Sequence, residues 1–208
     1  MATQIESRFF SSNKLPRGMI GAIFLQGAIT TALFVPLAVL VLGKWGAKSQ
    51  APPASPAPAR LSAPSVAWKL ALIVVAFVFF YMFFGYYVAW QSPAVRQYYG
   101  GPEQPTFYAA LKESWMHNRS IYPLQMLRAL LYAACLYPLI RMLRAGRWET
   151  ALAMALFLSV WTALLLLPNP LMPPAVAHAH FRETLAFSLL FGAIAGWLLY
   201  PLDHRRLT

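Results

Sequence analysis

Residues Ala67 to Trp90 read AWKLALIVVAFVFFYMFFGYYVAW, a run of 24 residues with a single charged side chain, Lys69. A helix rises about 1.5 Å per residue, so about 20 apolar residues cross the roughly 30 Å of hydrocarbon in a bilayer. A helix that is apolar on every face is expected in lipid or in a large buried core. The run therefore predicts a membrane-spanning helix.

Four other stretches of the chain have a similar length and apolar character. They are Ile20 to Leu42, Ile121 to Ile140, Trp148 to Leu167 and Glu183 to Leu202. The composition agrees, because 59% of the 208 residues are hydrophobic, only 11% are charged and the mean hydropathy is +0.53. We therefore expect an all-α, polytopic membrane helix bundle with five transmembrane helices, or with four if the first stretch does not cross.

The connections divide the chain into an N-terminal part and a bundle. An N-terminal segment, residues 1–19, precedes the first helix, which with its flank spans 20–48 and is too long for the apolar region of a cleaved signal peptide. Residues 49–66, SQAPPASPAPARLSAPSV, have the proline and alanine content of an extended, disordered linker. Residues 67–208 then hold the other four spans.

The longest connection inside the bundle contains one amphipathic segment. Phe107, Leu111 and Trp115 recur every fourth residue and would form one apolar stripe on a helix. Thr106 precedes the segment and is a favourable N-cap residue. We expect a short interfacial helix at about 106–117.

Few polar side chains lie within or at the mouth of the predicted spans, and each is costly there unless it has a partner. Some lie early in the third span and the others around the start of the fifth. In a five-helix chain these two spans start on the same face of the membrane, so the side chains share one leaflet. The candidate polar cluster consists of Gln125, Arg128, Asn169, His178, His180 and Glu183.

Several interpretations of this cluster stay open. Arg128 can snorkel to the interface, form an ion pair with Glu183, or anchor an anionic ligand. His178, His180 and Glu183 can bind a metal or shuttle protons, but no H-E-x-x-H or cysteine-rich pattern supports a metal site. We expect no cofactor beyond such a metal, and we favour an interfacial placement in which Glu183 occupies the first turn of the fifth helix.

Small residues recur along the fifth span. Thr184, Ser188, Gly192 and Gly196 are four residues apart, and the last two form a G-x-x-x-G spacing. Small residues allow another helix backbone to approach closely. We expect Ser188, Gly192 and Gly196 to pack against another helix of the same chain.

The formal net charge of +11 is spread between the apolar runs. No basic face is interleaved with aromatic residues, so we expect no nucleic acid partner. The short gap after the third span holds Arg141, Arg144 and Arg147, which favours a cytoplasmic gap and C-terminus, whereas the basic N-terminus favours the opposite orientation. We expect this gap to meet anionic lipid and the bundle to meet the lipid bilayer and a membrane protein partner.

Two segments resemble a known group of sequences. One is Gln125-Met-Leu-Arg128, and the other is Pro168-Asn-Pro-Leu-Met-Pro173 followed by Ala179-His-Phe-Arg-Glu183. They resemble uncharacterised bacterial integral membrane proteins with Q-x-x-R-G and P-N-P-x-M-P…A-H-F-x-E motifs, although Ala129 replaces the glycine and Ala177 an expected arginine. The resemblance implies a bacterial cytoplasmic (inner) membrane protein and no known activity. It singles out Gln125, Arg128, His180 and Glu183.

Three classes of function remain. We favour an accessory or structural membrane subunit, in which the polar cluster holds helices together. The alternatives are a small transporter or permease-like protein with Arg128 as anion anchor, and a membrane enzyme or metal protein that uses His178, His180 and Glu183.

Overall fold

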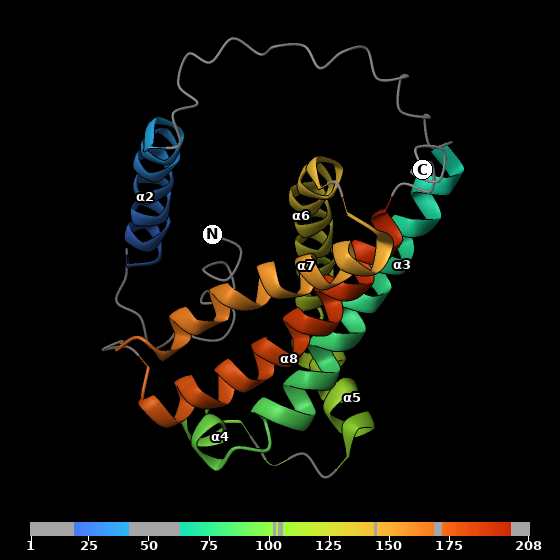
Figure 1. The fold of residues 1–208 in the computed structure, drawn as a ribbon. Coiled ribbons are helices and arrows are strands. Elements are labelled where there is room, and N and C mark those ends of the chain that lie inside the picture. The colour runs from blue at the N-terminus through green and yellow to red at the C-terminus, as the bar shows by residue number, and fades with distance from the viewer. Residues whose placement is uncertain are drawn as a thin grey trace, which may run out of the picture. The chain divides into compact units, whose positions relative to one another are not determined.

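The computed structural model describes residues 19–41, 63–101, 103, 106–143, 145–168 and 172–200, and every regular element in these ranges is helical. The chain divides into two units, Met1–Ala59 and Arg60–Thr208, and each is described by itself. The α-helices are α2 (Met19–Val41), α3 (Ala63–Phe84), α4 (Pro93–Tyr99), α5 (Phe107–His117), α6 (Ile121–Met142), α7 (Arg147–Val160) and α8 (Pro174–Leu199). The π-helical segment η1 (Gly85–Ala89) continues α3, and the 3₁₀ segment η2 (Trp161–Leu166) continues α7 (Figure 1). The expected all-α fold is confirmed for the described ranges.

Four continuous helices in the described part are long and apolar enough to cross a membrane. They cover Pro64–Ala89, Ile121–Met142, Arg147–Leu166 and Pro174–Leu199. These are the last four of the five predicted spans, so the membrane bundle is confirmed. The first predicted span coincides with α2, a helix of 23 residues. A fifth crossing by α2 stays a prediction.

Helix α8 is the central element of the second unit. It contacts α7, η2, α3, η1, α6 and α4, and Figure 1 shows it between α3 and α7. The core gathers one large side chain from each long helix, with Phe77, Leu136, Met154 and Phe191 all buried. Phe77 of α3 packs edge to face against both Phe187 and Phe191, with ring centroids 4.9 Å apart in each pair. Aromatic packing therefore joins α3 to the middle of α8.

The largest difference from the sequence prediction lies at the start of α8. The helix begins at Pro174, whereas the predicted span began at Glu183. The proline occupies a first-turn position, where its missing N–H costs nothing, and the following residues, AVAHAH, include three helix-favouring alanines. The expectation that Glu183 occupies the first turn is therefore wrong, because it follows more than two helical turns.

Two further boundaries differ. The predicted linker 49–66 is too long by at least four residues, because Ala63 already starts α3 and Pro64 fits its first turn. The connection after the second span, in which only the helix at about 106–117 was expected, also contains a short helix, α4, with Pro93 at its first position and Gly100 as its left-handed C-cap, φ 71°. These two residues are the usual start and stop signals of a helix.

The predicted interfacial helix forms as α5. Thr106 caps it, since its Oγ1 accepts a hydrogen bond of 3.1 Å from the N–H of Ala109. Several predictions fall outside the described residues. They concern the N-terminal segment before residue 19, the linker up to residue 62, Arg144, Asn169 and the C-terminal tail after residue 200.

Candidate functional site

His180 lies at the centre of a chain of three polar side chains. Its Nδ1 is 2.8 Å from Oε2 of Glu183, one turn later on α8, and its Nε2 is 3.2 Å from the hydroxyl of Tyr99 on α4. The His180 and Glu183 side chains are 22% and 16% exposed, so these two polar groups are mostly buried but within reach of the surface. The Tyr99 and His180 rings also meet edge to face at 5.7 Å. Both ring nitrogens of His180 therefore have a partner.

Helix α4 brings Tyr99 to His180 because it docks on the first turns of α8. Val95 of α4 is fully buried and packs with Val176 and Ala179 of α8. Val95 and Tyr99 are four residues apart, so they lie on the same face of α4. The apolar contact thus sets the position of the phenol.

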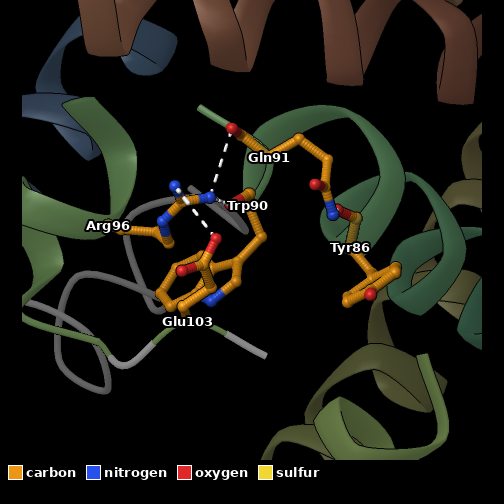
Figure 2. A network of polar contacts seen from close by, with 5 residues as sticks. All are labelled: Tyr86, Trp90, Gln91, Arg96 and Glu103. Carbon is orange, nitrogen blue, oxygen red and sulfur yellow. Dashed lines mark hydrogen bonds and ion pairs between the residues drawn. The ribbon is translucent and has the colours of Figure 1, made fainter. Parts of the chain in front are cut away.

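Arg96 fixes the turn that leads into α4, as Figure 2 shows. Its Nη1 donates to the carbonyl oxygens of Trp90 at 2.9 Å and Gln91 at 3.2 Å, and its Nη2 lies 3.7 Å from Oε1 of Glu103. The Gln91 side chain donates in turn to the carbonyl of Tyr86 at 3.1 Å. Carbonyls at a helix end lack intrahelical partners, and a cation there is favourable. Arg96 therefore stabilises the end of η1 and the orientation of α4.

The first residue of the π-helical segment faces Glu183. A Cβ built on Gly85, the first residue of η1, would lie 3.5 Å from Oε1 of Glu183, so the carboxylate rests on this glycine. Single π-helical turns within α-helices occur frequently at functional sites. The Glu183 carboxylate therefore contacts His180 through one oxygen, and its other oxygen faces Gly85 at the start of η1.

Arg128 has different neighbours from those expected. Arg128 and Gln125 on α6 are both buried, and Nη1 of Arg128 donates to Oε1 of Gln125 at 3.0 Å. The guanidinium also lies 5.8 Å from the ring centroid of Phe77. Among the ion pairs of the described residues, Glu183 is paired with His180 and not with Arg128.

The aromatic core explains this separation. Arg128 lies at the level of Phe77, which packs on Phe187, and Phe187 lies one turn, about 6 Å, beyond Glu183 along α8. The structure thus places four of the six predicted residues in two pairs at different depths, Gln125 with Arg128 and His180 with Glu183.

The remaining members of the predicted cluster are not brought to His180. His178 is exposed and lines an open hollow with Leu167, Pro168 and Met172, and Asn169 lies outside the described residues. In the part of the chain that the structure describes, no three His, Cys, Asp or Glu side chains are grouped so that they could hold a metal ion. His178, His180 and Glu183 are therefore not assembled into a three-ligand set.

The small residues of α8 lie against α7. A Cβ on Gly192 would come within 2.6 Å of the Met154 carbonyl oxygen, and one on Gly196 within 2.9 Å of Cα of Ala151. The contacts run in opposite directions along the two helices, so α7 and α8 are antiparallel. The same register places buried Ser188 opposite buried Ser159. Side-chain-free positions are needed here because the two backbones nearly touch.

The predicted basic gap joins α6 to α7. Arg141 lies in the last turn of α6 with its guanidinium 5.8 Å from the ring centroid of Tyr137, and Arg147 is the first residue of α7. The guanidinium of Arg147 lies 3.9 Å from the ring centroid of Trp197, and its Nε donates to the Trp197 carbonyl at 3.2 Å. The gap therefore contacts the end of α8.

Sequence reasoning missed Tyr99 and Arg96 as parts of the site, because the candidate cluster was chosen from polar side chains within or at the mouth of the predicted spans. The signal was present in Pro93 and Gly100, which frame a short helix. What no local pattern contained is the docking of that helix on α8, since it depends on residues 81 positions apart.

Comparison with known proteins adds no assignment. No family model, no curated protein and no solved structure matches the chain. The resemblance of the Q-x-x-R and A-H-F-x-E segments to an uncharacterised group stays a prediction.

Proposed function

We propose that this protein is an accessory or structural subunit of a bacterial inner membrane, in which the polar residues hold membrane and interfacial helices in a fixed arrangement. The observation that carries the proposal is the complete engagement of His180, whose two ring nitrogens contact Glu183 of α8 and Tyr99 of α4. The contact between Tyr99 and His180 joins polar groups of two different helices. A residue that holds two helices in a fixed arrangement requires such contacts.

The other polar contacts support the same function. Arg96 bonds to two backbone carbonyls of the turn before α4, and Arg128 bonds to Gln125 on its own helix. Each pairing offsets the cost of placing a polar group near or within hydrocarbon. The arrangement leaves a rigid bundle surface for a membrane protein partner. The basic gap, with Arg141 and Arg147, would face the cytoplasm and anionic lipid, as would the C-terminus.

The test compares two histidines on the same helix. We expect His180→Ala to lower the thermal midpoint of the full-length protein in mild detergent and to expose α4 to protease, because it removes both contacts. His178→Ala is the matched control, since this neighbouring side chain is exposed, and it should change neither property. Equal stability of the two variants would contradict the fastening role.

Native mass spectrometry of the gently solubilised protein tests the subunit assignment. We expect a membrane protein bound in fixed stoichiometry, and we expect the His180→Ala variant to lose it more readily than the His178→Ala variant. A protein that remains alone across detergents and expression levels would overturn the assignment to a subunit.

A second candidate function is proton transfer at the membrane edge, and one observation favours it. Glu183, His180 and Tyr99 form a continuous carboxylate–imidazole–phenol series with distances of 2.8 and 3.2 Å. A carboxylate that orients an imidazole allows the other ring nitrogen to exchange a proton with a hydroxyl. If this function holds, His180→Gln would retain thermal stability but abolish proton uptake into proteoliposomes that contain the protein. Wild-type proteoliposomes no more permeable to protons than empty ones would exclude it.

A further inference from the structure

The end of the bundle farthest from His180 along α8 carries a second group of charged residues. Here the start of α3, the turn between α6 and α7, and the end of α8 come together (Figure 1). The hydroxyl of Tyr200, just after α8, donates to the carbonyl of Ala145 in the turn at 3.2 Å. Arg147, the first residue of α7, donates to the carbonyl of Trp197 on α8 at 3.2 Å. The elements are thus tied together at this end.

Lys69, near the start of α3, lies at this end of the bundle. Its side chain is only 5% exposed, and it lies on the same helical stripe as Ile73 and Phe77, which are core residues. The spacing of four residues places all three on one face of α3. Lys69 is therefore the member of this core-facing stripe that lies nearest the start of α3, and it carries a positive charge whereas the other members are apolar.

A charge of the same sign acts on Lys69. Arg147 interacts with Lys69 electrostatically and unfavourably. Neither an ion pair nor a hydrogen bond of Lys69 occurs among the contacts within the described ranges. Buried cations side by side are costly unless an anion lies between them.

The carboxylates of the described part have other contacts. Glu103 faces Arg96, Glu113 faces His117 and Glu183 faces His180, while the exposed Glu149 accepts a hydrogen bond from the Gly146 N–H at 2.7 Å. Arg147 uses Nε for the Trp197 carbonyl and lays its guanidinium plane on the Trp197 ring, 3.9 Å from the centroid. This stacking fixes the guanidinium and leaves its terminal nitrogens available to an anion.

The aromatic neighbours indicate the depth of this site in the membrane. Trp148 is highly exposed and its ring lies 4.1 Å from that of Trp197, and Tyr200 is close by in the chain. Tryptophan and tyrosine gather at the level of the lipid headgroups, where phosphates are the abundant anions. The first turn of α7 adds the positive end of its helix dipole.

We propose that Lys69 and Arg147 bind the phosphate of an anionic phospholipid, such as phosphatidylglycerol or cardiolipin, at the junction of α3, α7 and α8. The Lys69 ammonium and the terminal nitrogens of Arg147 each donate charge-assisted hydrogen bonds to phosphate oxygens. The acyl chains then extend along the apolar surface of the bundle. The site is separate from the His180 cluster. It rests on the proposed contact of the basic gap with anionic lipid, but it does not depend on the assignment of the protein as a subunit.

The first experiment measures lipid binding to the full-length protein by native mass spectrometry after delipidation. Cardiolipin, phosphatidylglycerol and phosphatidylcholine are added in separate arms, and inorganic phosphate forms a further arm. We expect binding of the two anionic lipids, and binding about tenfold weaker or more in Lys69→Met and Arg147→Gln. Arg119→Gln is the control, because this exposed arginine precedes α6 at the other end of the bundle. Phosphate binding as tight as lipid binding would assign the site to a free anion instead.

Thermal stability provides a readout that a merely structural lysine would not give. In the delipidated protein, Lys69→Met should raise the thermal midpoint, because it removes repulsion from Arg147 and keeps the volume of the side chain. It should also abolish the rise in midpoint that cardiolipin gives the wild type. A Lys69→Met variant that is less stable than the wild type without lipid, or that keeps the full response to cardiolipin, would overturn the proposal.

Discussion

The two ends of α8 place charged residues in opposite ways. Near its start, Glu183 and His180 pair with each other and with Tyr99, so each polar group has a neighbour of complementary character. Near its end, Arg147 stacks on Trp197 and repels the buried Lys69. The first arrangement is complete within the chain, whereas the second needs an anion. The difference separates a site that stabilises the fold from one that is suited to a ligand.

Both ends depend on the seam that joins α7 to α8. We expect Gly192→Ile to have the largest effect, because a side chain would overlap the backbone of Met154 and Ala155. Overpacking of this kind costs about 3 kcal/mol or more when the obstacle is backbone. The measurement is the free energy of unfolding in mixed micelles. Gly146→Ala is the control, since its Cβ would meet only the Glu149 carboxylate at 3.5 Å.

A smaller effect is expected at the paired end of α8. Glu183→Gln removes the charge that holds His180 and should destabilise the protein by about 2 kcal/mol, the usual contribution of a hydrogen bond to a charged group. Chemical denaturation in detergent measures the change. If Glu183→Gln instead stabilised the delipidated protein, as we expect of Lys69→Met, the contrast between the two ends of α8 would be contradicted.

Removal of Arg96 tests how α4 is held in place. Arg96→Gln loses the bonds to the Trp90 and Gln91 carbonyls, and we expect a loss of about 1 kcal/mol with faster hydrogen exchange in α4. Exchange in α7 should stay unchanged, because that helix lies on another side of α8. Uniformly faster exchange in both helices would show that the two ends are not independent.

The smallest effect is expected from the cap of the interfacial helix. Thr106→Ala removes the bond to the Ala109 N–H and should cost about 0.5 to 1 kcal/mol of local stability. Hydrogen exchange in α5 should increase, while cardiolipin binding and the protection of α4 remain as in the wild type. A change in either would mean that α5 is coupled to one of the two ends.

Much of the fold follows from local sequence. The spans at Ile121 and Trp148 begin within one residue of the structural helices, because apolar length and flanking charge define them directly. The sequence prediction placed the start of α8 too late in the chain, because the polar residues His178, His180 and Glu183 resembled an interfacial turn. In the structure, Pro174 and the alanines that follow favour a helix there, and packing against α4 and η1 accommodates the polar side chains.

The candidate site was predicted in part, because some of its contacts follow from spacing along a single helix. The i to i+3 spacing of His180 and Glu183, and of Gln125 and Arg128, places each pair on one helical face, and both pairs form hydrogen bonds. Whether the two pairs meet depends on their depth in the membrane as well as on the leaflet that they share. The Phe77 and Phe187 rings keep them apart, and no pattern within a single helix contains that information.

The sequence by itself determined that this protein is a bundle of membrane helices with small residues along one seam and a basic gap after the third span. These properties depend on residue type and on periodicity along one helix, which are local. Only the tertiary structure decided that Tyr99 reaches His180 and that Arg147 stacks on Trp197. Both contacts join helices distant in the chain, and the docking of large side chains in the core sets which polar groups meet.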